Sequence, residues 1–168
     1  MPFDYYRRLS KANQAIYRKS DQLRFIALPQ ALDLTSIVKA IESHLVKGNR
    51  REVQAYAQSF CDALAKTLKV PSLKVQVLLV RPSSRTAELH GLYTREEGKR
   101  SLIQVWMKTA AYKRVVRFRT FLRTLLHEFC HHLDYELLGL KDSFHTEGFF
   151  ARESSLMSRF ADKNDKAT

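Results

Sequence analysis

Apolar residues recur at spacings of three and four along much of this chain, and this spacing is typical of amphipathic α-helices. The clearest case is residues 118–138, where Phe121, Leu125 and Phe129 belong to one apolar stripe. The same spacing predicts helices at 34–46, 52–68 and 149–160, and the basic residues 4–24 have helical character. The chain therefore contains several helices, one of them long and largely apolar.

Three other stretches are rich in Val, Leu and aromatic residues, which favour β-strands. We expect strands at 73–80, 86–93 and 102–107, with a polar turn around Gly98 between the last two. The order of elements predicts an α+β fold. In this fold a small antiparallel or mixed three-stranded sheet packs on helix 118–138, and further helices precede the sheet.

The 168 residues and the hydrophobic fraction of 45% suit one domain with a substantial core. We expect a basic helical extension at 1–30, the main domain at 31–161 and a frayed tail at 162–168. No apolar run approaches the roughly 18 residues of a membrane span, and the first residues lack the apolar segment of a secretory signal. These features predict a cytoplasmic protein without a membrane partner, in which Cys61 and Cys130 are free thiols.

Polar residues interrupt the apolar helix at His127-Glu128-Phe129-Cys130-His131. Histidines four residues apart fall about 40° apart around a helix axis, so both imidazoles can reach one metal ion. Glu128 lies about 100° from His127, close to the open side of that metal, where it can take a proton from water. This is the H-E-x-x-H arrangement of zinc metallopeptidases. The plain alternative is a solvated polar stretch on an amphipathic helix.

A third ligand with metzincin spacing is excluded. Metzincins place a glycine three residues after the second histidine and a histidine six residues after it. Here those positions hold Asp134 and Leu137.

Thirteen residues separate His131 from His145, which lies in the segment that follows the helix. Gly139 is a plausible helix end, so His145 would lie at the start of the following helix and face back to the metal. We therefore predict His145 as the third ligand. Glu153 and Glu147 are rivals, because gluzincins take a glutamate from a second helix.

The segment from Leu125 to His131, followed after a gap by His145 and then Phe149 four residues later, resembles the SprT-like family of zincin metallopeptidases. That family includes the DNA–protein crosslink protease Spartan. The stretches 87–93 and 102–107 are similar to the two strands that precede the active-site helix in the family, so the resemblance covers roughly residues 70–155.

The resemblance implies a zincin-like fold with Zn²⁺ held by His127, His131 and His145, and Glu128 as general base. Two features depart from the family. Thr146 stands where the family often has glycine, and the two cysteines do not form the zinc ribbon that often follows.

The zincin resemblance also implies a place for the substrate. An edge strand in zincins runs along the cleft and pairs with an extended peptide, and we expect residues 102–107 to be this strand. Trp106 either lines that cleft or packs in the core. Tyr93 and Tyr112 are candidate donors to the oxyanion, although core packing is the simpler interpretation of each.

Two polar residues beside the motif are less informative. Asp134 points about 20° from the direction of His127, so it either holds a ligand imidazole or is a surface carboxylate. We expect His132 to be a surface or capping residue.

The charge balance adds a possible partner. The chain has 29 Lys and Arg against 17 Asp and Glu, a net charge of +12, and several of the cations gather between Lys108 and Arg123. Such an excess favours acidic partners, above all the phosphates of nucleic acids, although it also serves solubility. No helix-turn-helix or finger motif is evident, so any DNA binding should be non-specific.

The sequence therefore predicts a zinc-dependent peptidase acting on protein or peptide substrates, with DNA-associated proteins as one class. One alternative is a basic nucleic-acid or protein adaptor whose zinc is structural. A structural site needs four protein ligands, whereas a catalytic site keeps one position open. Another is a toxin-like or mobile-element protein that uses the same chemistry on a single partner.

Overall fold

The computed structural model describes residues 1–84 and 88–161. The helices in these ranges are the 3-10 helix η1 (Asp4–Arg8) and α1 (Lys11–Gln22), α2 (Thr35–Val46), α3 (Arg50–Leu68), α4 (Phe118–Glu136) and α5 (Glu147–Phe160). The strands are β1 (Lys74–Val80), β2 (Gly91–Thr94) and β3 (Leu102–Lys108). The predicted α+β class is confirmed, with a mixed sheet, while the predicted tail at 162–168 lies outside the described residues.

Two helices begin earlier than their apolar stripes predict, because polar side chains cap them. The Asn49 side chain accepts a hydrogen bond from the Glu52 N–H, so α3 starts at Arg50. The Thr146 hydroxyl likewise accepts from the Phe149 N–H at the start of α5. Both helices therefore include a polar first turn that periodicity alone does not detect.

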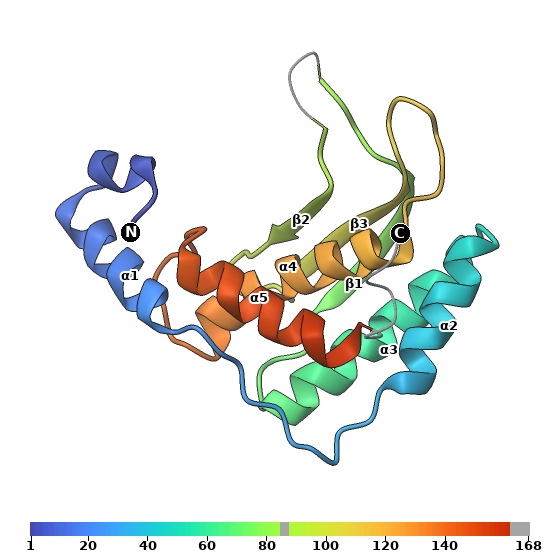
Figure 1. The fold of residues 1–168 in the computed structure, drawn as a ribbon, viewed down its shortest axis with the longest axis horizontal. Coiled ribbons are helices and arrows are strands. Elements are labelled where there is room, and N and C mark those ends of the chain that lie inside the picture. The colour runs from blue at the N-terminus through green and yellow to red at the C-terminus, as the bar shows by residue number, and fades with distance from the viewer. Residues whose placement is uncertain (85–87, 162–168) are drawn as a thin grey trace.

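Helix α4 lies between the sheet and α5, as Figure 1 shows. Its buried face, which includes Phe121, Leu125 and Phe129, joins a core shared with α2, α3, α5 and the sheet. The helix that carries the histidine motif is thus held on both sides by packed elements.

The sheet has the order β1-β3-β2, with β1 parallel and β2 antiparallel to β3. The prediction that 102–107 forms an edge strand is therefore wrong, because β3 is central and pairs on both sides. Strands packed on two faces and paired on two edges carry mainly apolar side chains, and Ile103, Val105 and Met107 are fully buried. Trp106 is buried too.

The two edges of the sheet differ in what covers them. The side chain of Gln54 on α3 accepts from the Val77 N–H, and that of Gln58 accepts from the Val75 N–H. These amides satisfy the outer backbone groups of β1. The outer edge of β2 instead faces a cleft along α4, described below.

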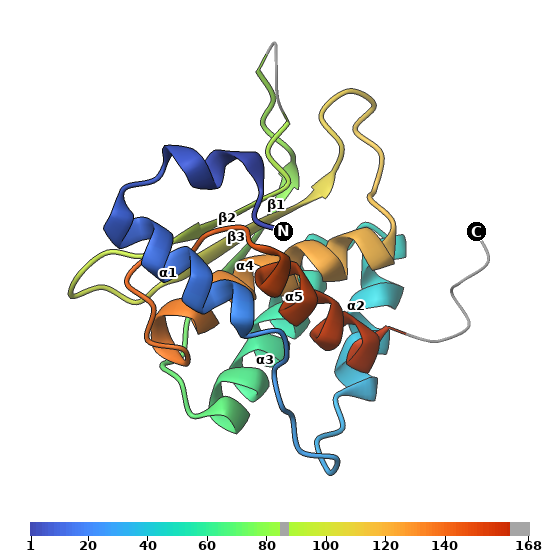
Figure 2. The ribbon, with the colours of Figure 1, turned by 60° about the vertical axis from the view of Figure 1, so that its left-hand side comes forward.

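The N-terminal segment, residues 1–24, packs on α5 and on the loop before it (Figure 2). Gly148 makes this close approach feasible, since a Cβ there would lie 2.5 Å from the carbonyl oxygens of Ser20 and Asp21. No helix among the described residues is long and apolar enough to cross a membrane.

Candidate metal centre

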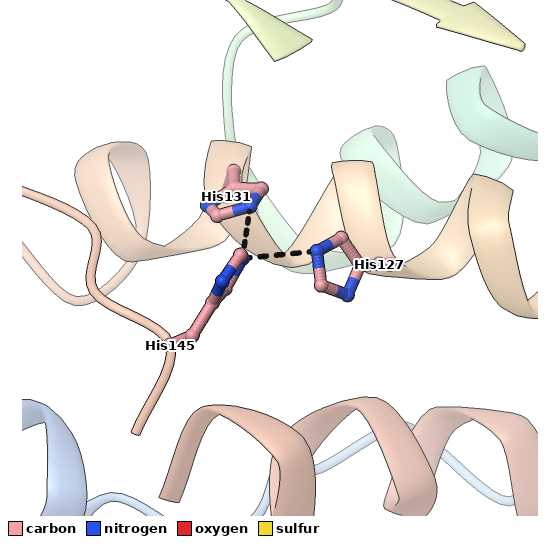
Figure 3. A group of neighbouring side chains, drawn as sticks. All are labelled: His127, His131 and His145. Carbon is pink, nitrogen blue, oxygen red and sulfur yellow. Dashed lines mark hydrogen bonds between the residues drawn. The ribbon is translucent and has the colours of Figure 1, made fainter. Parts of the chain in front are cut away.

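Three histidines converge on one point (Figure 3). His127 and His131 lie one turn apart on α4, and His145 faces them from the loop before α5. The Nε2 atom of His145 is 3.1 Å from Nε2 of His127 and 3.1 Å from Nε2 of His131. Zinc–nitrogen bonds of about 2.0–2.1 Å place two tetrahedral ligand atoms about 3.3 Å apart. The three histidines therefore lie close enough to hold a metal ion.

The protonation of these imidazoles also suits metal binding. Burial, followed by the neighbouring His127 and His145, lowers the pKa of His131 to about 3. Burial and His127 lower the pKa of His145 as well. A metal binds the neutral imidazole, so near neutral pH both rings are in the ligand form.

Glu153 orients His127. Its Oε2 atom lies 2.8 Å from Nδ1 of His127, and its Oε1 atom accepts a hydrogen bond of 2.9 Å from Arg123. Burial raises the pKa of Glu153, but the hydrogen bonds from His127 and Arg123 outweigh burial and hold the pKa below its usual range. An ionised carboxylate only accepts, so Nδ1 carries the proton and Nε2 keeps its lone pair for a metal. Glu153 thus lies behind His127, outside the cluster of three.

Glu147, the other rival ligand, is engaged elsewhere. One carboxylate oxygen lies 3.2 Å from the N-terminal amine, and the other lies 3.9 Å from the Arg24 guanidinium.

A second chain of hydrogen bonds orients His131. Its Nδ1 atom is 2.6 Å from the Ser143 hydroxyl, and that hydroxyl donates to Oδ2 of Asp134 at 2.7 Å. Because the hydroxyl proton goes to the carboxylate, Ser143 must accept from Nδ1–H, which leaves Nε2 unprotonated. Asp134 therefore supports a ligand imidazole through Ser143.

Arg152 completes this chain and ties it to the N-terminal segment. Its side chain is 1% exposed; it donates to Oδ1 of Asp134 at 2.9 Å and to the Ser20 carbonyl at 2.7 Å. The sequence carries a signal for this role. Arg152 stands three residues after Phe149 and four before Leu156, on the buried stripe of its helix, where a cation needs an acidic partner.

His145 depends on the N-terminal segment for its position. The Tyr5 hydroxyl donates to the His145 carbonyl at 2.6 Å. The hydroxyl of Thr146, the next residue, lies 3.2 Å from that of Ser20. On the other side, the Phe149 ring packs against the His145 ring with centroids 5.1 Å apart.

Glu128 lies beside the histidines, at the base of β2. It is 7% exposed, and burial raises its pKa to about 7, despite the opposing effects of His127 and a hydrogen bond from the Tyr93 backbone. Gly91 permits this approach, because a Cβ at that position would lie 2.7 Å from Oε1 of Glu128 and 2.7 Å from Cγ2 of Thr124. A carboxylate with such a pKa suits a general base near neutral pH.

The three histidines and Glu128 all line one cleft of about 1250 Å³. Helix α4 and its N-cap residue Arg117 line the cleft as far as Tyr135. Strand β2 and the residues before it form one wall, and Phe150 and Glu153 of α5 form the other. The side chains of Leu89, Leu92 and Val46 give the cleft an apolar part. The site is therefore open to an extended molecule.

Two predictions about individual side chains, His132 and Tyr112, are wrong. His132 is neither a surface nor a capping residue: it is buried, with Nδ1 3.0 Å from the Tyr93 hydroxyl and Nε2 2.7 Å from the Pro71 carbonyl. Tyr112 does not pack in the core, since its side chain is 78% exposed. Tyr93 is half-buried, and its hydroxyl also donates to Ser101 at 3.1 Å.

Comparison of the chain with protein-family models, curated proteins and solved structures finds no match in any of the three.

Proposed function

We propose that this protein is a zinc-dependent peptidase of the SprT-like, zincin kind. The observation that carries the proposal is the placement of a buried glutamate, with a pKa of about 7, in the same cleft as three converging imidazoles. Within the described residues the cluster has three members, fewer than the four of a structural zinc site. This count favours catalysis over the adaptor alternative.

In this proposal the zinc is held by His127, His131 and His145. Glu153 orients His127 through its Nδ1 atom, and Ser143 orients His131 in the same way. Bound zinc would supply Lewis acidity, lowering the pKa of water to about 7 and polarising the scissile carbonyl. Glu128 accepts the proton of the attacking water and passes it to the leaving amine.

The edge of β2 is the docking site for the substrate backbone. Because β1 is covered by α3 and β3 is central, β2 is the strand whose outer edge faces the cleft. An extended peptide added there would pair through its main chain, which places few demands on its sequence. Unfolded segments of proteins are therefore the expected substrates.

The test is Glu128→Gln in the zinc-loaded protein, assayed on an unfolded protein substrate. The amide keeps the shape of the side chain but cannot act as a base, so cleavage should fall by at least about a hundredfold while zinc content stays the same. Equal cleavage by the parent and the variant would contradict the assigned mechanism. Zinc retained without any cleavage by the parent would favour the adaptor alternative.

A second function, DNA binding, is favoured by the loop between β3 and α4. The exposed Tyr112 ring has the Arg114 guanidinium carbon 5.6 Å from its centroid, and Lys113 is exposed beside it. Exposed aromatic rings among cations suit stacking of single-stranded bases and contact with phosphates. We infer sequence-independent DNA binding, with DNA-associated proteins among the substrates.

Titration of DNA at two salt concentrations tests this second function. Affinity should fall steeply as salt rises, and Tyr112→Ala should weaken single-stranded binding by about 1–3 kcal/mol. An absence of binding at low salt would remove nucleic acid as a partner.

A further inference from the structure

One end of the cleft carries two arginines without an acidic partner. Arg117 and Arg119 line the cleft at the start of α4 and are exposed. Among the described residues neither takes part in an ion pair. The third arginine of the cleft, Arg123, is paired with Glu153 at 2.9 Å. The charge of Arg117 and Arg119 is therefore available to a ligand.

The acidic residues nearby do not cancel this charge. Glu88 is held by the Ala110 N–H at 2.7 Å and lies 3.8 Å from Arg81. Glu42 of α2 also lines the cleft and is the one carboxylate facing this end that has no partner among the described residues. Two unpaired cations against one unpaired anion leave this end positive.

The two arginines lie on the path of a molecule that follows α4 towards its first turn. At 100° per residue, Arg119 lies about 80° to one side of the His127 direction. Arg117 is the extended N-cap residue just before the helix, and it also lines the cleft. Thr124 and Glu128 fall on the opposite side from Arg119, and both lie against Gly91 of β2. Arg123 falls on the side of Arg119, where it meets Glu153 of α5. A chain that lies along this end of the cleft would therefore pass both arginines.

The direction of β2 decides which part of a peptide reaches them. Gly91 lies against Thr124 and Glu128, the Tyr93 ring stacks on Tyr135, and Arg95 pairs with Glu136, so β2 and α4 run in the same sense. A peptide paired antiparallel to β2, the more stable arrangement, runs in the opposite sense. Its residues after the scissile bond then lie towards the start of α4.

The distance of the two arginines from His127 determines which residue of the peptide reaches them. Arg119 and Arg117 precede His127 by eight and ten residues, or about 12–15 Å at 1.5 Å per residue. An extended peptide covers this distance in about four residues at 3.3 Å each.

We propose that Arg117 and Arg119 bind a substrate carboxylate about four residues to the C-terminal side of the scissile bond. The inference rests on the proposed peptidase function for the direction of the peptide. The carboxylate is an Asp or Glu side chain or the C-terminus of a short peptide, since both offer the bidentate acceptor that a guanidinium prefers. The protein is thus selective for acidic segments on one side of the cut.

The first test maps cleavage of a degenerate peptide pool by the zinc-loaded parent protein, using mass spectrometry. Asp and Glu should be enriched about 1.5- to fivefold over Lys at the third to fifth residues after the cut, the range expected for exposed ion pairs. The enrichment should disappear in the double variant Arg117→Glu/Arg119→Glu. It should persist in Arg51→Glu, which makes the same kind of charge change on α3, outside the cleft. Pools with free and amidated C-termini separate a terminal carboxylate from a side chain.

Three outcomes would overturn the inference and leave the proposed peptidase function intact. The first is cleavage with equal use of Glu and Lys, and the second is enrichment of acidic residues before the cut. The third is enrichment that persists in the double variant. Failure of the parent to cleave any peptide would instead count against the proposed function.

A binding measurement tests the arginine site even if the parent protein cleaves no peptide. Fluorescence anisotropy compares labelled peptides that carry Glu or Lys in their C-terminal half, bound to the Glu128→Gln protein. Tighter binding of the Glu peptide, lost when Arg117 and Arg119 are reversed, supports the arginine site. Equal binding overturns it. The inference also fails if these reversals abolish oligonucleotide binding and leave Glu-peptide binding unchanged, because the arginines would then belong to a nucleic-acid surface.

Discussion

The candidate metal site joins two regions that are held in place by different means. His127 and His131 belong to α4, where backbone hydrogen bonds and core packing fix both Cα atoms. His145 belongs to a loop whose position depends on contacts with the N-terminal segment, such as the Tyr5 hydroxyl on its carbonyl. Half of the site is therefore local in sequence, and the other half is assembled from residues more than a hundred positions apart.

This difference shows where the site is sensitive to change. A helix keeps two ligands in register whatever happens elsewhere, because the i and i+4 positions always meet on one face. A loop ligand loses its position when its distant contacts weaken. Ser143 and Arg152 connect the two regions, since they join His131 through Asp134 to the end of α1.

The largest effect should come from removing a ligand. His131→Ala should lower zinc affinity by more than about 100-fold, because loss of a residue that only supports a ligand already costs up to about 100-fold. The helix should remain, because alanine favours helix formation. His145→Ala should lower it similarly. Competition with a chelating dye measures both affinities. Unchanged affinity in His145→Ala, together with loss in Glu153→Ala, would assign the third ligand to Glu153.

A smaller effect should follow from breaking the link between the two regions. Ser143→Ala removes the acceptor of the His131 Nδ1–H and should lower zinc affinity by about 10- to 100-fold. Ser154→Ala, at an exposed position on α5, is the matched control and should bind zinc like the parent. If both variants bind like the parent, Ser143 has no part in holding His131 in place.

The smallest effect should come from the N-terminal contact. Tyr5→Phe deletes one hydrogen bond to the His145 carbonyl, worth about 0.5–1.5 kcal/mol, so zinc affinity should fall about two- to tenfold. Tyr6→Phe is the control, because the Tyr6 hydroxyl instead accepts from Arg18. Equal zinc affinity in the two variants would mean that the N-terminal segment does not support the third ligand.

The sequence by itself determined the part of this protein that obeys local periodicity. The stripe through Phe121, Leu125 and Phe129 predicted α4, and the four-residue spacing of His127 and His131 placed both imidazoles on one face. The α+β class also followed, because strands and helices differ in their apolar period. His145 was predicted because it follows the helix end at Gly139 and begins the returning segment, and the structure brings it to the other two.

Tertiary structure alone decided what depends on pairing between distant residues. The apolar pattern of β3 is that of a strand covered on both sides, yet its place in the sheet order follows from β1 and β2 lying beside it. His132 was expected at the surface because its helical position says nothing about Pro71 or Tyr93, which enclose it. The roles of Ser143, Arg152 and Tyr5 are equally non-local. Each depends on a hydrogen bond whose partner is distant along the chain or is set by the path of a loop, and such bonds leave no periodic trace in the sequence.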